Sequence, residues 1–256
     1  MTIRSVFFLI ILLEGLNVHA QLEIHKLTDS VYVYTTYREL ESGPFPSNSM
    51  YVLTSDGIVM IDTPWDTTQL APLLDSMKVK HNAAPIFSFS THFHDDRTAG
   101  LKKLDSMGVK THSTLKTKNL CLKHNNEIAQ HTFLGDTLLN IGGKQIQFYY
   151  PGKGHTEDNI VVYVNGDDVL YGGCLVKSYE ATNLGYTGDS GTLDEWIESL
   201  KIIKKKFKSA DFIIPGHQSW TSKQSINHSI KLLKKEQKII EKMSNNDCTP
   251  KALRRN

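Results

Sequence analysis

The chain has 256 residues, which suits one large domain, and its 39% hydrophobic content is enough for a substantial core. A formal net charge of +2 argues against a nucleic-acid-binding protein, so no nucleic acid is expected as a partner. Three cysteines are too few for a disulfide-rich scaffold. A disulfide between Cys121 and Cys248 stays open at this stage.

The first twenty residues have the pattern of a secretory signal peptide. Arg4 gives a basic start, residues 6–13 form an apolar run too short to span a bilayer, and Val18-His19-Ala20 has small residues at the positions that a signal peptidase reads. We therefore expect cleavage after Ala20, export to the periplasm, and no membrane attachment of the mature chain.

Strand and helix patterns alternate in the first half of the mature chain. Apolar alternation predicts strands at residues 22–26, 31–34, 51–61 and 86–90, the third interrupted by the hairpin turn Ser55-Asp56-Gly57. Between the second and third strands, residues 37–49 are expected to form a loop. Helical spacing predicts helices over residues 67–77 and around Leu101, Leu104 and Met107, with Gly108 as C-cap.

The second half repeats this plan. Strands are predicted at residues 145–150, 160–164, 169–171 and 212–214, with a turn at Asn165-Gly166-Asp167. Thr192 and Glu195 form a capping box that begins one helix, and residues 223–243 form a long amphipathic helix. The pattern predicts an α/β fold, a four-layer αββα sandwich of two packed β-sheets with helices on the outer faces. We expect one domain over residues 21–245, followed by a polar tail over 246–256.

Four short segments carry metal-ligating residue types beside glycines or at the ends of predicted strands. They are His92-Phe93-His94-Asp95-Asp96-Arg97, Gly154-His155-Thr156, Gly172-Gly173-Cys174 and Pro215-Gly216-His217. On an extended segment His92, His94 and Asp96 point to the same side. A lone His pair would indicate surface polarity, but the four segments together favour a metal centre. The remaining mature-chain histidines are interpreted as surface or packing residues: His25, His81, His112, His124, His131 and His228.

The ligand types divide into two sets of three. The neutral imidazoles of His92, His94 and His155 favour a Lewis-acidic zinc. A second, softer site consists of Asp96, Cys174 and His217, in which the thiolate favours zinc over magnesium or calcium. Three protein ligands leave one coordination position open, so the sequence predicts two neighbouring zinc ions per chain that act in hydrolysis.

The four segments, with Asp158-Asn159 after His155 and Leu175-Val176-Lys177 after Cys174, resemble the class B metallo-β-lactamases, and more narrowly their broad-spectrum, two-zinc subclass. The resemblance covers essentially the whole mature chain. It implies hydrolysis of the amide bond of small-molecule β-lactam antibiotics (penicillins, cephalosporins and carbapenems) by a zinc-bound hydroxide, without a covalent acyl-enzyme. We expect the enzyme to be a monomer.

Two other interpretations stay open from the sequence. One is a thioester or lactone hydrolase of the same superfamily. Members of that kind usually have a His after the Asp and a bridging Asp later, where this chain has Arg97 and Cys174. The other is a non-enzymatic periplasmic zinc-binding protein, although a storage site would close its coordination sphere.

The resemblance also implies roles around the metal ligands. Asp96 and Lys177 are expected to take part in catalysis, Lys177 by pairing with the substrate carboxylate. The segment 37–49 is similar in place to a mobile flap, with Phe45 over an apolar substituent of the substrate. Asp62 and Trp65 are expected to support the cleft.

Two further expectations concern Arg97 and Tyr186. Arg97 is expected to help hold Cys174 as thiolate. Tyr186 stands in the substrate-binding region where the family often has Asn, which donates to the lactam oxygen. Either the three-imidazole zinc carries more of that stabilisation, or the tyrosine hydroxyl reaches the oxygen.

Overall fold

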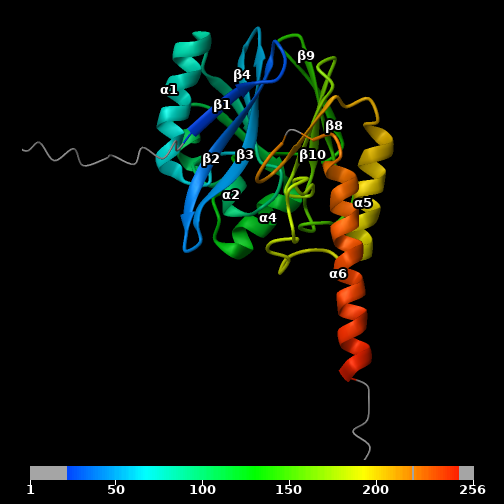
Figure 1. The fold of residues 1–256 in the computed structure, drawn as a ribbon. Helices are drawn as coiled ribbons and strands as arrows, with labels where there is room; N and C mark the ends of the chain where they lie inside the picture. Colours follow the sequence, from blue (N-terminus) through cyan, green and yellow to red (C-terminus); the bar gives the residue numbers. More distant parts are fainter. Residues whose placement is uncertain (1–21, 221, 248–256) are drawn as a thin grey trace, which may run out of the picture.

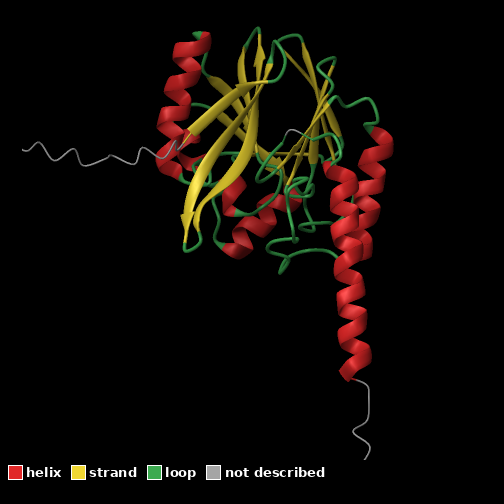
Figure 2. Cartoon of the chain, viewed as in Figure 1, coloured by secondary structure: helices red, strands yellow, loops and turns green. Residues whose placement is uncertain are grey.

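The computed structural model describes residues 22–220 and 222–247, which form two mixed β-sheets packed face to face (Figures 1 and 2). The seven-stranded sheet has the order β1-β2-β3-β4-β5-β6-β7: β1 Leu22–Lys26, β2 Val31–Leu40, β3 Gly43–Thr54, β4 Gly57–Ile61, β5 Pro85–Phe89, β6 Lys110–Thr114 and β7 His131–Phe133. The five-stranded sheet has the order β12-β11-β10-β9-β8: β8 Thr137–Ile141, β9 Lys144–Tyr149, β10 Val161–Asn165, β11 Val169–Gly173 and β12 Phe212–Pro215.

Helices cover the outer faces of both sheets. The helices in the described ranges are η1 Thr67–Gln69, α1 Leu70–His81, α2 Asp95–Thr98, α3 Leu101–Ser106, α4 Leu115–His124, α5 Leu193–Lys206 and α6 Ser225–Asp247. Helices α1 and α3 pack on the seven-stranded sheet, and α5 and α6 pack on the five-stranded sheet. Within the described ranges, no helix is long and apolar enough to cross a membrane.

The alternation of side chains along the strands explains the layers. On β2, Val31 and Val33 face the space between the sheets, whereas Tyr32 and Tyr34 pack against the helices on the outer face. The inter-sheet core draws on both sheets and includes Met50, Val52, Val59, Ile61, Phe89, Ile146, Phe148, Val162, Val164, Tyr171 and Ile214. The predicted four-layer αββα sandwich is therefore confirmed.

Local turn and capping signals are confirmed as well. Strands β3 and β4 pair antiparallel with Thr54 opposite Gly57, as the Ser55-Asp56-Gly57 signal predicts. The Thr192 hydroxyl accepts from the Glu195 backbone N–H and the Glu195 carboxylate accepts from that of Thr192, the complete capping box. The C-cap of α3 is Met107, one residue before the predicted Gly108, which follows it with φ +83°.

The prediction of a loop over residues 37–49 was wrong. Strand β2 continues to Leu40 and β3 begins at Gly43, so a β-hairpin fills this segment, with Phe45 opposite Arg38. The polar helix α4 and the strands β6, β7 and β8 were also absent from the sequence prediction.

The two predicted terminal segments lie mainly outside the described residues. The signal peptide over residues 1–20 and most of the tail, Cys248 included, fall there. Helix α6 runs to Asp247, two residues into the segment expected to be tail. Cys121 is buried and free, with its Sγ 3.7 Å from the Phe93 carbonyl oxygen.

Candidate metal centre

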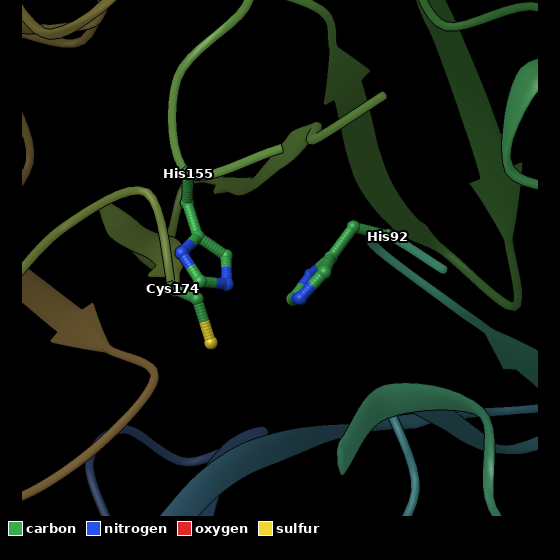
Figure 3. Close-up of side chains that lie close together, drawn as sticks. All are labelled: His92, His155 and Cys174. Atoms are coloured by element: carbon green, nitrogen blue, oxygen red, sulfur yellow. The ribbon is translucent and has the colours of Figure 1, made fainter. Parts of the chain in front are cut away.

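The four ligand-bearing segments meet at one edge of the sandwich. His92 follows β5, Cys174 directly follows β11, and His217 is the second residue after β12. His155 lies in the connection between β9 and β10. Figure 3 shows the imidazoles of His92 and His155 and the thiol of Cys174 converging on one space.

Asp96, Cys174 and His217 form one close group, as predicted. The Nε2 atom of His217 lies 3.1 Å from Asp96 Oδ2 and 3.3 Å from Cys174 Sγ. The thiol sulfur and that carboxylate oxygen are 3.4 Å apart. A carboxylate, a thiol and an imidazole so close together are a set of donors suited to one zinc ion.

The three imidazoles lie together, but His92 also approaches the other group. His155 Nε2 is 3.2 Å from His94 Nδ1, and the His92 ring centroid lies 4.9 and 5.1 Å from those of His94 and His155. Close ligand-atom groups join His92 with His155 and Cys174, and again with His94 and Asp96. The two predicted sets are therefore immediate neighbours with His92 between them.

Asp96 reaches this place by a different route from the one the sequence predicted. The extended backbone ends at His94, and Asp96 is the second residue of the one-turn helix α2. Its Oδ1 lies 3.8 Å from His92 Nε2, an i,i+4 relation. A helical turn, and not continued strand alternation, brings the carboxylate beside the imidazoles.

The buried imidazoles are in the form that binds metal ions. Burial lowers the pKa of His92 and of His155 well below the usual histidine value. Neutral imidazole is the ligand form. His92 Nε2 and His155 Nδ1 are both buried without a hydrogen-bond partner among the described residues. Unpaired buried nitrogens are costly, and a metal ion would satisfy at least the His92 nitrogen that faces the cluster.

The second group carries concentrated negative charge. Burial alone would raise the pKa of Asp96, but the Arg97 guanidinium together with His217 and His92 outweighs it, and the pKa is held well below its usual range. Burial alone would lower the pKa of His217, but the Cys174 thiolate and the Asp96 carboxylate raise it to about 9. A protonated His217 thus balances the negative charge of Asp96 and Cys174, which a bound metal cation would balance in its place.

Arg97 is fully buried and joins the loops that carry the ligands. Its Nη2 donates to Cys174 Sγ at 3.0 Å and to the Gly216 carbonyl at 2.9 Å, and it forms an ion pair with Asp96 Oδ2 at 2.9 Å. A Cβ at Gly216 would lie 2.7 Å from Cys174 Sγ and 2.8 Å from Arg97 Nη2, so only glycine fits. The contact predicted between Arg97 and Cys174 is present.

Asp62 orients the segment that carries His92. Its carboxylate accepts from the Thr91 backbone N–H at 2.7 Å and from the Thr91 hydroxyl at 2.8 Å. The Tyr171 hydroxyl donates to Asp62 at 2.7 Å. Burial raises the Asp62 pKa to about 6, although Arg97 and these hydrogen bonds oppose it. Asp62 thus holds the residue that directly precedes His92, which is the geometry that its predicted supporting role requires.

A cleft of about 670 Å³ opens above the cluster, and that size suits a small molecule. The expected substrate-binding residues Phe45, Lys177 and Tyr186 line it, as does Trp65. The Phe45 and Trp65 rings both lie beside His217, with centroids at 5.1 and 6.1 Å. The lining thus combines aromatic faces with one ammonium group.

Lys177 lies on one side of this cleft. Its Nζ is 5.1 Å from the centroid of the Trp196 ring. Burial lowers its pKa, and the negative charges of Cys174 and Asp96 oppose this effect. No carboxylate pairs with its Nζ within the described part of the chain. The ammonium group can therefore pair with an anionic ligand.

Sequence reasoning missed two residues at the edge of the site. Asp189 Oδ2 lies 3.1 Å from His94 Nε2, although 95 positions separate the two in the chain. Arg38 donates to Asp95 at 2.9 Å and covers the Trp65 ring at 4.7 Å, linking the β2–β3 hairpin to the ligand segment. The only signal for Asp189 in the sequence was its place three residues after Tyr186, which was expected to bind substrate.

Comparison with known proteins agrees with this geometry. Residues 42–217 match the metallo-beta-lactamase superfamily. A curated protein named metallo-beta-lactamase type 2, from Elizabethkingia meningoseptica, is 38% identical over 229 residues, which cover 88% of this chain and 92% of that protein.

Solved structures show the same fold. The crystal structure of metallo-beta-lactamase IND-7 has a TM-score of 0.81 at 33% identity and covers 84% of this chain and 99% of its own. The metallo-beta-lactamase FIM-1 from Pseudomonas aeruginosa, solved in a mono-zinc form, has a TM-score of 0.77 at 27% identity and covers 84% and 96%.

Proposed function

Since the chain belongs to the metallo-β-lactamase superfamily, we propose that it is a zinc-dependent β-lactamase acting on penicillins, cephalosporins and carbapenems. One observation carries the proposal. Asp96, Cys174 and His217 lie within 3.4 Å of one another beside three imidazoles, at the base of a cleft the size of a small molecule. A thiolate in this set separates the chain from hydrolases with only oxygen and nitrogen ligands.

Two zinc ions per chain are proposed. His92, His94 and His155 would hold one ion, and Asp96, Cys174 and His217 the other. The unpartnered Nε2 of His92 and the two neutral, buried imidazoles support the fit. Zinc in such sites lowers the pKa of a bound water to about 7 and polarises a carbonyl oxygen.

The side chains of this protein then bind and orient the substrate. The Lys177 ammonium would pair with the carboxylate that β-lactams carry, and Phe45 and Trp65 would cover the apolar part of the molecule and exclude water. Asp96 would take part in catalysis from a position between the two ligand sets. One of its carboxylate oxygens faces His92 and the other faces His217. No side chain is needed as a nucleophile, so no covalent acyl-enzyme forms.

A chromogenic cephalosporin tests the proposal directly. We expect the purified protein to open the ring, a chelator to abolish turnover, and added zinc to restore it. A zinc-loaded protein that leaves every β-lactam intact would refute the proposal. Hydrolysis of a thioester or lactone instead would identify another hydrolase of the superfamily, and zinc binding without any turnover would identify a zinc-binding protein.

Replacing Lys177 by alanine should raise KM about 10- to 100-fold and lower kcat much less. The loss corresponds to about 1.5–3 kcal/mol for a hydrogen bond to a charged group. Steady-state kinetics with a carboxylate-bearing cephalosporin measures both constants. Lys153→Ala is a matched control, because Lys153 pairs with Glu195 at 3.7 Å and does not line the cleft. An unchanged KM in Lys177→Ala would reject the carboxylate role.

The proposal also covers the processing, the cellular location and the oligomeric state of the enzyme. We infer that residues 1–20 are a signal peptide removed after Ala20, that residues 21–245 form the catalytic domain, and that the mature protein is a periplasmic monomer. The N-terminal sequence of the exported protein and its mass in solution measure these points.

A further inference from the structure

The segment that carries His92 and His94 lies beyond the end of its strand. Strand β5 ends at Phe89, and residues 90–94 belong to none of the described strands. Backbone outside a sheet lacks the ladder of hydrogen bonds that fixes a strand, so its polar groups need other partners. Side chains from elsewhere in the fold must therefore fix the peptide groups between the two imidazoles.

The carbonyl oxygen of Phe93, between the two histidines, accepts from the side chain of Asn126. Asn126 Nδ2 lies 2.8 Å from this oxygen, and Cys121 Sγ lies 3.7 Å from it. The oxygen belongs to the peptide group whose N–H is that of His94, and the six atoms of a peptide group are coplanar. The Asn126 bond thus fixes the plane from which the His94 side chain projects.

The end of helix α4 places Asn126 at this position. Asn125 is the C-cap of the helix and is left-handed, with φ 58°, a conformation that asparagine tolerates. The Asn126 backbone N–H donates to the Cys121 carbonyl at 3.0 Å. The Asn126 backbone is therefore tied to the helix, and its side-chain amide reaches Phe93 from a fixed point.

The ring of Phe93 is anchored on the same helix. Phe93 is 3% exposed and packs with Leu120, Cys121 and Ile128. These contacts hold its side chain, while the Asn126 amide holds its carbonyl group. Helix α4 and the residues that follow it thus constrain the residue between the two ligands at both its side chain and its backbone.

We infer that Asn126 is a positioning residue, which acts through the Phe93 carbonyl to keep His92 and His94 in the arrangement that a zinc ion requires. The inference rests on the proposed role of these two histidines as zinc ligands. Ligands that are held in place before the ion arrives bind it more tightly, because less conformational freedom is lost on binding.

Zinc affinity, measured by competition with a chromogenic chelator, tests the inference without relying on turnover. Asn126→Leu keeps about the same side-chain shape without the donor, and Asn126→Ala removes the side chain. We expect each variant to bind zinc more weakly on the order of 3- to 10-fold, the range that one neutral hydrogen bond supplies.

The loss should belong to the site formed by the three imidazoles. In a Cys174→Ser background, which lacks a ligand of the other proposed ion, Asn126→Leu should weaken the remaining site by the same factor. Asn165→Leu is the matched control, because Asn165 Nδ2 donates to Gln145 Oε1 at 3.3 Å outside the cleft. It removes an amide donor from another place and should leave zinc affinity unchanged.

Asn126 also lines the cleft, so contact with the substrate is the competing role. A higher KM of Asn126→Leu in zinc excess, with unchanged zinc affinity, would assign that role and overturn the inference. Two other results would overturn it: a less stable zinc-free protein with unchanged zinc affinity, or a loss of affinity in Asn126→Ala that Asn126→Leu does not show. The first would make Asn126 merely structural, and the second would mean that packing and not the hydrogen bond is responsible.

The same measurements separate this inference from the proposed function. If the wild-type protein binds zinc but opens no β-lactam, the proposed function fails while the role of Asn126 is still decided by zinc affinity. If the wild-type protein binds no zinc, both fail.

Discussion

Replacing Arg97 by alanine is expected to lower the free energy of unfolding by about 3–5 kcal/mol, the cost of removing one partner of a buried ion pair. Arg97 is fully buried and lies within salt-bridge distance of Asp96 at 2.9 Å and Asp62 at 3.7 Å. The truncation leaves both carboxylates without their cation and also removes the donor to the Asn48 and Gly216 carbonyls. Urea denaturation in the presence of a chelator measures the effect free of differences in bound metal.

Arg38→Ala is the control for this experiment. Arg38 also pairs with an aspartate, Asp95 at 2.9 Å, but its side chain is 42% exposed. Solvent screening limits such pairs to less than about 1 kcal/mol. If Arg97→Ala and Arg38→Ala lowered the free energy of unfolding equally, the burial of the Arg97 network would contribute nothing to stability.

Arg97→Lys distinguishes charge from geometry. Lysine keeps the positive charge but lacks the planar fork, which reaches Asp96, Cys174 and two carbonyl oxygens at once. We expect a stability between those of the wild type and Arg97→Ala.

The layers of the fold and the close approach of the ligand segments could be predicted because both follow from local patterns. The continuous apolar runs of β2 and β10 give each strand two buried faces, so each must lie between a second sheet and a helical layer. The parallel pairs β4–β5 and β11–β12 bring Asp62, His92, Cys174 and His217 to one edge.

The β2–β3 hairpin could not be predicted because Pro44 and Pro46 argue against a strand. The structure tolerates them because pairing of β3 with β4 ends at Met50, which leaves residues 43–49 of β3 without a β4 partner. Because Pro44 and Pro46 lie in this part of β3, their missing backbone N–H groups interrupt no hydrogen bonds between β3 and β4. Ser47 instead forms an isolated bridge with His217.

Helix α4 and strand β6 could not be predicted from the sequence for another reason, because they bury few apolar side chains. The buried residues of α4 are Thr117, Leu120 and Cys121, and those of β6 are Thr111, Ser113 and Thr114. Polar segments of this kind are held by tertiary contacts and show no hydrophobic periodicity.

The contact of Asp189 with His94 could not be predicted for a third reason. It bridges 95 positions, and no local pattern pairs two residues at that separation. The Asp96 position was predicted by strand alternation, yet it results from a helical turn. The ligand types were therefore more predictable than the backbone that presents them.

Replacing Cys174 by serine is expected to reduce bound zinc from two ions to about one per chain and to lower kcat/KM by about 10²- to 10³-fold, the typical cost of losing one preorganised electrostatic stabiliser. A serine hydroxyl stays protonated where the thiolate ligates zinc, and Arg97 loses the sulfur it contacts at 3.0 Å. Metal analysis of the dialysed protein and cephalosporin kinetics give the two readouts. Cys121→Ser is the matched control, because Cys121 is equally buried but belongs to none of the close ligand groups, and it should retain both ions. Two tightly held zinc ions in Cys174→Ser would contradict the assignment of the thiolate as a ligand, whatever the change in rate.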